Sequence, residues 1–175
     1  LQHWPWTRKQ KQEFIDSRVI PGLALVSAIQ NASRRPRVFL QSSGINRYGL
    51  RGEGLADESA PPAQDFLAQM TVPWESATES LETLGVRRIV TRNAVVLAKN
   101  GGMFPLMALP VRLFFGGRFG NGKQAVPWIH IVDQIGAICF LLENENAHGP
   151  YNLISPTPTS NADFMRAISK ALHRP

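Results

Sequence analysis

The feature that most constrains the fold of this chain is the alternation of helix-like and strand-like segments. Residues Thr7–Ile29 carry apolar side chains at helical spacing, with a charged opposite face. In Arg37–Gly44 a short apolar run then leads into Ser-Ser-Gly, which is typical of a buried parallel strand that ends in a polar loop. The alternation continues to the C-terminus. It predicts an α/β layer architecture with a parallel sheet.

The remaining elements follow from the same patterns and from turn residues. Further helices are predicted at Pro73–Leu84, at Val132–Leu142 and in a last segment that Asn161 caps and that runs to Leu172. Met103–Phe115 is predicted to be a helix or a helix pair broken by Pro105 and Pro110. Further strands are predicted at Val86–Thr91, Trp128–Ile131 and Tyr151–Ile154. Residues 46–64 form a loop and Gly116–Gly122 a turn, Pro21 should kink or split the first helix, and Gly85 should end the second.

Polar side chains follow two of the predicted strands. Ser42 and Ser43 end the first, and Thr91 to Asn93 end the second. Ligands of open α/β sheets gather at the carboxyl ends of the strands. A site at this edge is therefore expected before any family is considered.

The net charge and the composition limit the classes of partner that are expected. The net charge is +6, which suits either a nucleic-acid surface or a solvated helix face near a phosphorylated small molecule. The second interpretation is favoured because no nucleic-acid-binding motif is present. No apolar run reaches about 18 residues, so no membrane span is predicted.

Cysteine and histidine usage argues against several kinds of site. The one cysteine, Cys139, excludes an internal disulfide, and its apolar surroundings predict a small buried side chain rather than a nucleophile. His3, His148 and His173 are scattered without ligand spacing, so no metal site is expected.

Five stretches, in this order, resemble the extended short-chain dehydrogenases/reductases of the nucleotide-sugar epimerase and dehydratase group. Within this group they resemble more closely the epimerase-like subfamily once labelled as cell-division inhibitors. The stretches are Trp6-Thr7-x-Lys9 with Ser17-Arg18; Ser42-Ser43-Gly44 with Tyr48-Gly49; Trp74-Glu75-x-Ala77; Gly116-Gly117 through Gln124 to Trp128-Ile129-His130-x-x-Asp133; and Gly149-Pro150-Tyr151-Asn152 with Asn161 and Phe164.

The resemblance implies part of a Rossmann-type parallel sheet with a small substrate-side lobe. Residues 1–100 would be the later part of the NAD(P)-binding domain, and residues 101–175 mainly the substrate lobe with returning Rossmann elements. The glycine-rich phosphate loop would lie well before Trp6, in the first βα unit, and about 70 to 80 residues should precede this chain if a βαβ unit takes about 30. Gly116–Gly122 follows a helix-like segment, so we interpret it as a turn and not as a substitute loop.

The resemblance also implies ligands, partners and a location. The full-length protein would bind NAD or NADP and a small-molecule substrate, such as a sugar nucleotide, but no nucleic acid or membrane. The 175-residue chain alone should bind neither cofactor tightly. A cytoplasmic location is expected, as is a homodimer through Thr7–Ile29 and Pro73–Leu84.

The acid–base pair of the wider family is replaced in this sequence. Active members use Tyr-x-x-x-Lys, in which the lysine lowers the pKa of the phenol, whereas here Trp74 stands in the Tyr slot and Thr78 in the Lys slot. Neither side chain titrates usefully. The resemblance implies the following roles: catalysis by Ser43 and Tyr48; cofactor binding by Ser42, Trp74, Thr78 and Arg92; substrate binding by Arg118, Trp128 and His130.

These assignments leave alternatives open. Ser43 is either an orienting serine or a strand-end serine bonded to its own loop, and Tyr48 either a site residue or a packing aromatic. Glu75 is expected to be a solvated helix residue rather than a replacement for the missing acid–base pair. His130 is either a general base or, as favoured, a residue that braces the start of a helix through a backbone hydrogen bond. The protein is accordingly either an NAD(P)-dependent oxidoreductase or a non-catalytic dinucleotide-binding protein of the same fold.

Overall fold

A parallel three-stranded sheet forms the centre of the molecule. The computed structural model describes residues 6–49 and 55–174. Strands β1 (Val38–Gly44), β2 (Arg87–Asn93) and β6 (Gly149–Leu153) lie in the order β1-β2-β6, all parallel. The predicted α/β architecture with a parallel sheet is confirmed.

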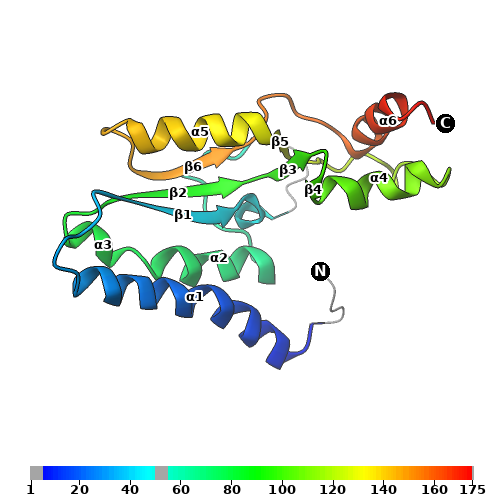
Figure 1. Cartoon of the computed structure of the whole chain (residues 1–175). Coiled ribbons are helices and arrows are strands. Elements are labelled where there is room, and N and C mark those ends of the chain that lie inside the picture. The colour runs from blue at the N-terminus through cyan, green and yellow to red at the C-terminus, as the bar shows by residue number, and fades with distance from the viewer. Residues whose placement is uncertain (1–5, 50–54, 175) are drawn as a thin grey trace.

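Helices cover both faces of this sheet (Figure 1). Helices α1 (Arg8–Gln30), α2 (Phe66–Ser76) and α3 (Ser80–Thr83) lie on one face, and α5 (Ile131–Glu143) lies on the other. The short helix η1 (Ile45–Tyr48) leaves the end of β1. The carboxyl ends of the three strands therefore meet at one edge, between two helical layers.

A small lobe adjoins that edge. Its sheet joins β4 (Gly101–Gly102), β3 (Val95–Ala98) and β5 (Trp128–His130), and its helices are α4 (Phe104–Arg112) and α6 (Asn161–Ala171). Ala94 alone separates β2 from β3, so the chain passes directly from the central sheet into the lobe. The predicted helix at Met103–Phe115 and the strand at Trp128 are present, whereas β3 and β4 were not predicted.

Helix α1 runs unbroken through Pro21, so the predicted split does not occur. Thr7 begins the helix with a capping box, in which its hydroxyl accepts from Gln10 N and the Gln10 side chain accepts from Thr7 N. Close packing holds the region after the proline, because a Cβ added at Gly22 would lie 3.1 Å from Ala77 Cβ. Tertiary packing thus outweighs the backbone hydrogen bond that proline cannot make.

The second predicted helix begins earlier and ends earlier than expected. The Asp65 side chain accepts from Leu67 N at 3.0 Å and Ala68 N at 3.1 Å, so α2 starts at Phe66 and Pro73 lies inside it. The helix stops at Ser76, and the short α3 follows. The prediction of one helix over Pro73–Leu84 was therefore wrong, although Gly85 does end the segment with a φ of 75°.

Two further local predictions were wrong. Ser160, not Asn161, caps α6, because its hydroxyl accepts from Asp163 N, while Asn161 Oδ1 accepts from Phe119 N in the glycine-rich turn. Cys139 is exposed, because α5 buries only one side against the sheet and Cys139 lies on the other.

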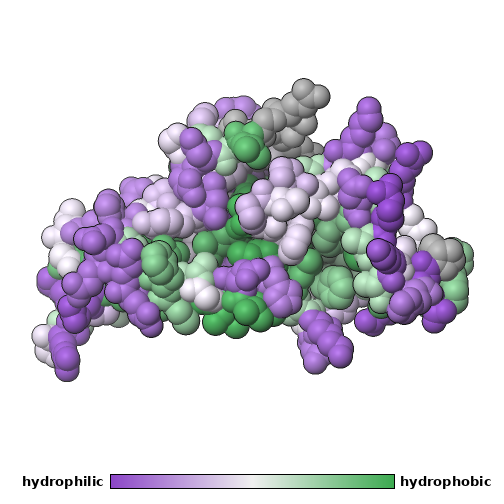
Figure 2. Space-filling model, turned by 90° about the horizontal axis from the view of Figure 1, so that it is seen from above, coloured by the Kyte–Doolittle hydropathy of each residue, from purple (hydrophilic) through white to green (hydrophobic). Residues whose placement is uncertain are grey.

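The outward side of α5 also exposes Val132, Ile135 and Phe140. Figure 2 looks down on this side of the molecule and shows hydrophobic residues between hydrophilic ends. No helix in the described part of the chain is both long and apolar enough to cross a membrane.

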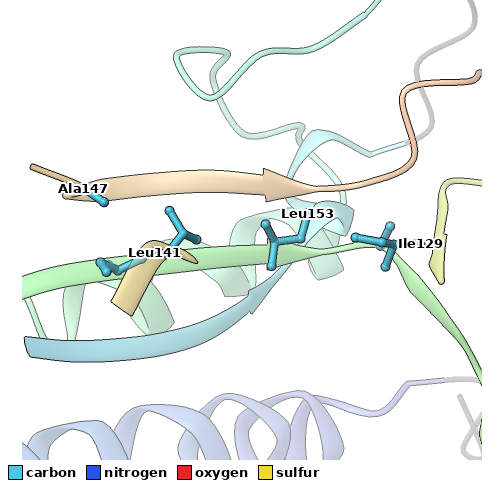
Figure 3. Packing of buried hydrophobic residues seen from close by; sticks show 6 residues of the cluster. Ile129, Leu141, Ala147 and Leu153 are labelled. Atoms are coloured by element: carbon cyan, nitrogen blue, oxygen red, sulfur yellow. The ribbon is translucent and has the colours of Figure 1, made fainter. Parts of the chain in front are cut away.

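Two hydrophobic clusters hold the layers together. One lies between α5 and the central sheet and contains Ile89, Leu141, Leu153 and, from β5, Ile129 (Figure 3). The other joins α4 to α6 in the lobe and includes Val111, Phe164 and Ile168. The first cluster contains residues of both sheets, which fixes the lobe beside the strand ends.

Candidate active site

The two serines at the end of β1 lie on opposite sides of the sheet. Successive strand residues point to opposite faces, and Ser43 is only 4% exposed on the α2 side while Ser42 is exposed on the α5 side. Ser43 is paired in register with Arg92, and Ser42 with Thr91. The carboxyl edge therefore has two polar faces, with different side chains on each.

The α2 face carries a buried ion pair. Glu75 Oε1 accepts from Ser43 Oγ at 2.7 Å and from Arg92 Nε at 3.1 Å, and its Oε2 accepts from Arg92 Nη2 at 2.8 Å. The Glu75 and Arg92 side chains are 9% and 5% exposed. The expectation that Glu75 is solvated was wrong, because α2 turns this residue toward the sheet.

The environment of Glu75 favours its charged form. Burial alone raises the pKa of its carboxyl, but the hydrogen bonds from Arg92 and Ser43 and the charges of Arg92 and Arg47 outweigh burial and hold the pKa below its ordinary value. Arg92 responds in the opposite sense: burial lowers its pKa, and the partners Glu75 and Tyr48 raise it overall. Glu75 is accordingly a fixed anion at neutral pH and not a poised base.

Tyr48 extends this network to β6, and Asn152 extends it to the loop before α2. Its hydroxyl donates to Asn152 Oδ1 at 2.8 Å and accepts from Arg92 Nη1 at 2.8 Å, and the residue is 4% exposed. The Glu58 carboxylate accepts from Asn152 N at 2.7 Å. Tyr48 thus joins the ends of β2 and β6, and Asn152 connects them to Glu58.

A second buried network lies deeper under α2. Arg88 Nε donates to Thr78 Oγ1 at 2.8 Å, the Thr78 hydroxyl donates to Gln41 Oε1, and Gln41 Nε2 donates to the Trp74 carbonyl at 2.6 Å. Arg88 also donates to the Glu75 carbonyl. The slot that a lysine occupies in active relatives of the wider family is here enclosed and lies beside a guanidinium.

Trp74 faces away from Ser43. Its ring is half-buried and lies 5.3 Å from the Arg18 guanidinium of α1. The next residue, Glu75, is the one that contacts Ser43. The sequence alignment therefore places Trp74 opposite Ser43, whereas the helix directs the Trp74 side chain toward α1.

The α5 face carries an uncharged row of three side chains. Gln134 Nε2 donates to Asn93 Oδ1 at 2.7 Å, and Asn93 Nδ2 donates to Ser42 Oγ at 2.7 Å. Gln134 comes from the first turns of α5, and Asn93 ends β2. Ser42 and Asn93 remain accessible at the edge.

The predicted substrate-side residues lie in the lobe, two of them on strand β5 and one on the glycine-rich turn. His130 caps α5, its Nδ1 accepting from Val132 N at 3.3 Å, as the helix-bracing interpretation predicts. Trp128 Nε1 donates to Thr159 Oγ1 at 3.0 Å, and Arg118 is exposed on the glycine-rich turn. Their roles in substrate binding stay predictions.

The opposite edge of the sheet has a hollow of about 360 Å³ beside Glu82, Arg87, Arg88 and His148. It lies at the amino ends of β2 and β6, away from the polar edge. Arg87 is engaged there in the fold, since its guanidinium donates to the carbonyls of Leu141 and Leu142 at the end of α5 and of Ala147 before β6. Among the described residues no three metal-ligating side chains come together.

Sequence reasoning missed four members of these networks: Gln41, Glu75, Arg88 and Gln134. One signal was available for Glu75 and Arg88, because a charged residue next to a buried strand or on a covered helix needs a partner. No sequence signal identified Gln134, whose position depends on how α5 docks on the sheet.

Comparison with known proteins bears out the motif order. The sequence model described as "NAD dependent epimerase/dehydratase family" matches residues 1–153. "Epimerase family protein YfhF" of Bacillus subtilis is 33% identical over 171 residues, which cover 97% of this chain and 56% of that protein. The chain therefore spans little more than half the length of such curated relatives.

Solved structures agree with the sequence comparison. The human epimerase family protein SDR39U1, crystallised with NADPH, has a TM-score of 0.88 and 32% identity over 97% of this chain and 57% of that chain. The nucleoside-diphosphate sugar epimerase of Corynebacterium glutamicum has a TM-score of 0.85 and 29% identity over 97% of this chain and 36% of that chain. The predicted partial Rossmann-type fold is confirmed.

Proposed function

The chain belongs to the NAD dependent epimerase/dehydratase family, and we propose that the full-length protein binds NAD or NADP and acts as an oxidoreductase of the epimerase type. The observation that carries the proposal is the polar edge at which β1 and β2 end side by side, with Ser42 and Asn93 accessible. Ligands of parallel sheets bind at such an edge. The relative SDR39U1 was crystallised with NADPH, which supports the choice of cofactor.

The proposed substrate is a small sugar-like molecule or a sugar nucleotide. The relative from Corynebacterium glutamicum is a nucleoside-diphosphate sugar epimerase, which supports this class. Arg118, Trp128 and His130 are the proposed substrate-side residues, and Arg118 supplies an exposed cation suited to a phosphate. Dimerisation through α1 and the Pro73–Leu84 segment, and a cytoplasmic location, are part of the same proposal.

A second candidate function is favoured by one specific contact. Ser43 donates its proton to Glu75, so it does not present that proton to a substrate oxygen. Trp74 and Thr78 add no titrating group to the site. These features support a non-catalytic dinucleotide-binding protein of the same fold.

One experiment on the full-length protein separates the two candidates. NADPH and NADH are titrated by cofactor fluorescence, with unlabelled NADP⁺ as competitor, and turnover is then screened with sugar nucleotides and carbonyl compounds. Saturable binding with turnover is the expected result. Binding without turnover across the screen favours the non-catalytic candidate, and absence of binding by both cofactors contradicts both.

A further inference from the structure

The two faces of the polar edge differ in what they leave available to a ligand. On the α2 face, the Ser43 proton goes to Glu75, and the Arg92 guanidinium is held by Glu75 and Tyr48. On the α5 face, Ser42 Oγ accepts from Asn93, and its own proton meets no acceptor within residues 6–49 and 55–174. The accessible serine is therefore the one with a free donor.

A backbone carbonyl group fixes which side chain donates and which accepts in each hydrogen bond on the α5 face. Asn93 Nδ2 lies 3.3 Å from the Ser43 carbonyl oxygen, which can only accept. Asn93 Oδ1 must then face Gln134, whose Nε2 donates to it. The hydrogen bonds run from Gln134 to Asn93 to Ser42, and this polarisation strengthens Ser42 as a donor.

Gln134 provides a second and independent observation. The residue is 7% exposed, and its Oε1 is enclosed without a hydrogen-bond donor from the described residues. A buried acceptor without a donor is destabilising, and such groups mark positions that need a reason beyond packing. A hydrophobic residue at this helix position would be buried without the cost of an unsatisfied acceptor.

We propose that the row Gln134–Asn93–Ser42 is a hydrogen-bonding site that presents the Ser42 hydroxyl to a carbonyl oxygen of the bound ligand. The proposal rests on the proposed function. The row itself is uncharged, and the nearby guanidinium of Arg92 is paired on the other face, so a neutral acceptor fits better than a phosphate or carboxylate. The carbonyl belongs either to the nicotinamide carboxamide or to a keto substrate.

In this assignment Ser42 takes the ligand-contacting role that sequence resemblance gives to Ser43. Asn93 and Gln134 are positioning residues that act through Ser42. Aspartate at position 93 would accept the Ser42 proton instead of donating to the serine, so Asn93→Asp would reverse the bond that the row needs.

The test compares Ser42→Ala with Ser43→Ala in the full-length protein. We expect Ser42→Ala to weaken ligand binding roughly three- to tenfold, the range for loss of one neutral hydrogen bond. Ser43→Ala should lower stability through Glu75 while leaving ligand affinity within about twofold. A raised Kd for NADPH and NADP⁺ identifies the carboxamide as the partner, and a raised KM with unchanged Kd identifies the substrate carbonyl.

Asn93→Asp provides a readout that a merely structural role would not give. It should raise the same constant, Kd or KM, that Ser42→Ala raises. The double variant should bind no more weakly than Ser42→Ala alone, since both changes remove the same interaction. Provided that the wild type binds cofactor, two outcomes overturn the assignment. In one, Ser42→Ala leaves both Kd and KM unchanged; in the other, Ser43→Ala weakens ligand binding more than Ser42→Ala does. Failure of the wild type to bind either cofactor overturns the proposed function and this site together.

Discussion

Ser43 Oγ lies 2.7 Å from Glu75 Oε1 and donates its proton to that carboxylate, which Arg92 holds through two further hydrogen bonds. A strand end, a helix and a second strand are thereby joined through one buried anion. In this chain Ser43 belongs to an internal ion-pair network and not to an open Tyr–Lys site.

Removal of the Glu75 charge should destabilise the fold strongly. Glu75→Gln leaves the buried Arg92 guanidinium without its counter-charge, and loss of one partner of a buried pair costs about 3–5 kcal/mol. The free energy of unfolding is measured with urea. Glu79→Gln, an exposed glutamate on the same segment, is the control and should change stability by less than about 0.5 kcal/mol. Equal losses in the two variants would contradict a buried ion pair.

The contribution of Glu75 should depend on pH. Because its pKa is lower in the folded state than its ordinary value of 4.5, it stabilises the fold above about pH 4.5, and that stabilisation is lost as the pH falls through the folded pKa. Urea unfolding from pH 7 to pH 3 should show the gap between wild type and Glu75→Gln narrowing below pH 4.5. A gap that stays constant or widens in acid would be inconsistent with the lowered pKa.

Restoring the lysine of the wider family should not restore its site. Thr78→Lys would place an ammonium group where Thr78 Oγ1 lies 2.8 Å from Arg88 Nε, in a fully buried position. We expect a loss of at least about 3 kcal/mol in unfolding free energy from an unpaired buried charge. Trp74→Tyr is the matched control, because it restores the other residue of the motif at a half-buried position and introduces no buried charge. A stable Thr78→Lys variant with raised cofactor affinity would show that the slot is open.

His130 should behave as a helix cap. His130→Ala removes the acceptor of Val132 N and should cost about 1 kcal/mol, whereas His130→Ser keeps an N-cap acceptor and should retain most of the stability. Thermal unfolding measures both variants, and turnover is assayed beside it. Loss of turnover in the stable His130→Ser variant would instead support the predicted substrate-binding role.

The fold was largely predictable because its signals are local. The apolar run before Ser42 and the helical spacing of Thr7–Ile29 each identify one element without knowledge of the rest. The start of α2 was missed because Asp65, its cap, lies beside a polar, proline-containing loop that gives no helical period. Helix α1 was expected to kink or split at Pro21, but it continues through the proline, where the next residue, Gly22, packs closely against Ala77.

The site was predictable in place but not in composition. Parallel strands bring Ser42, Ser43 and Asn93 to one edge, and this follows from topology alone. Which serine faces which helix depends on the exact register of β1. The burial of Glu75 and Gln134 depends on how α2 and α5 dock on the two faces, which no local pattern encodes.

A crystal structure of the full-length protein with NADP⁺ and a keto sugar tests the central claim most directly. The account predicts a ligand carbonyl oxygen within hydrogen-bonding distance of Ser42 Oγ, with the bonds from Ser43 and Arg92 to Glu75 unchanged. A structure in which Ser43 Oγ leaves Glu75 and contacts the ligand, while Ser42 contacts only solvent, would contradict it.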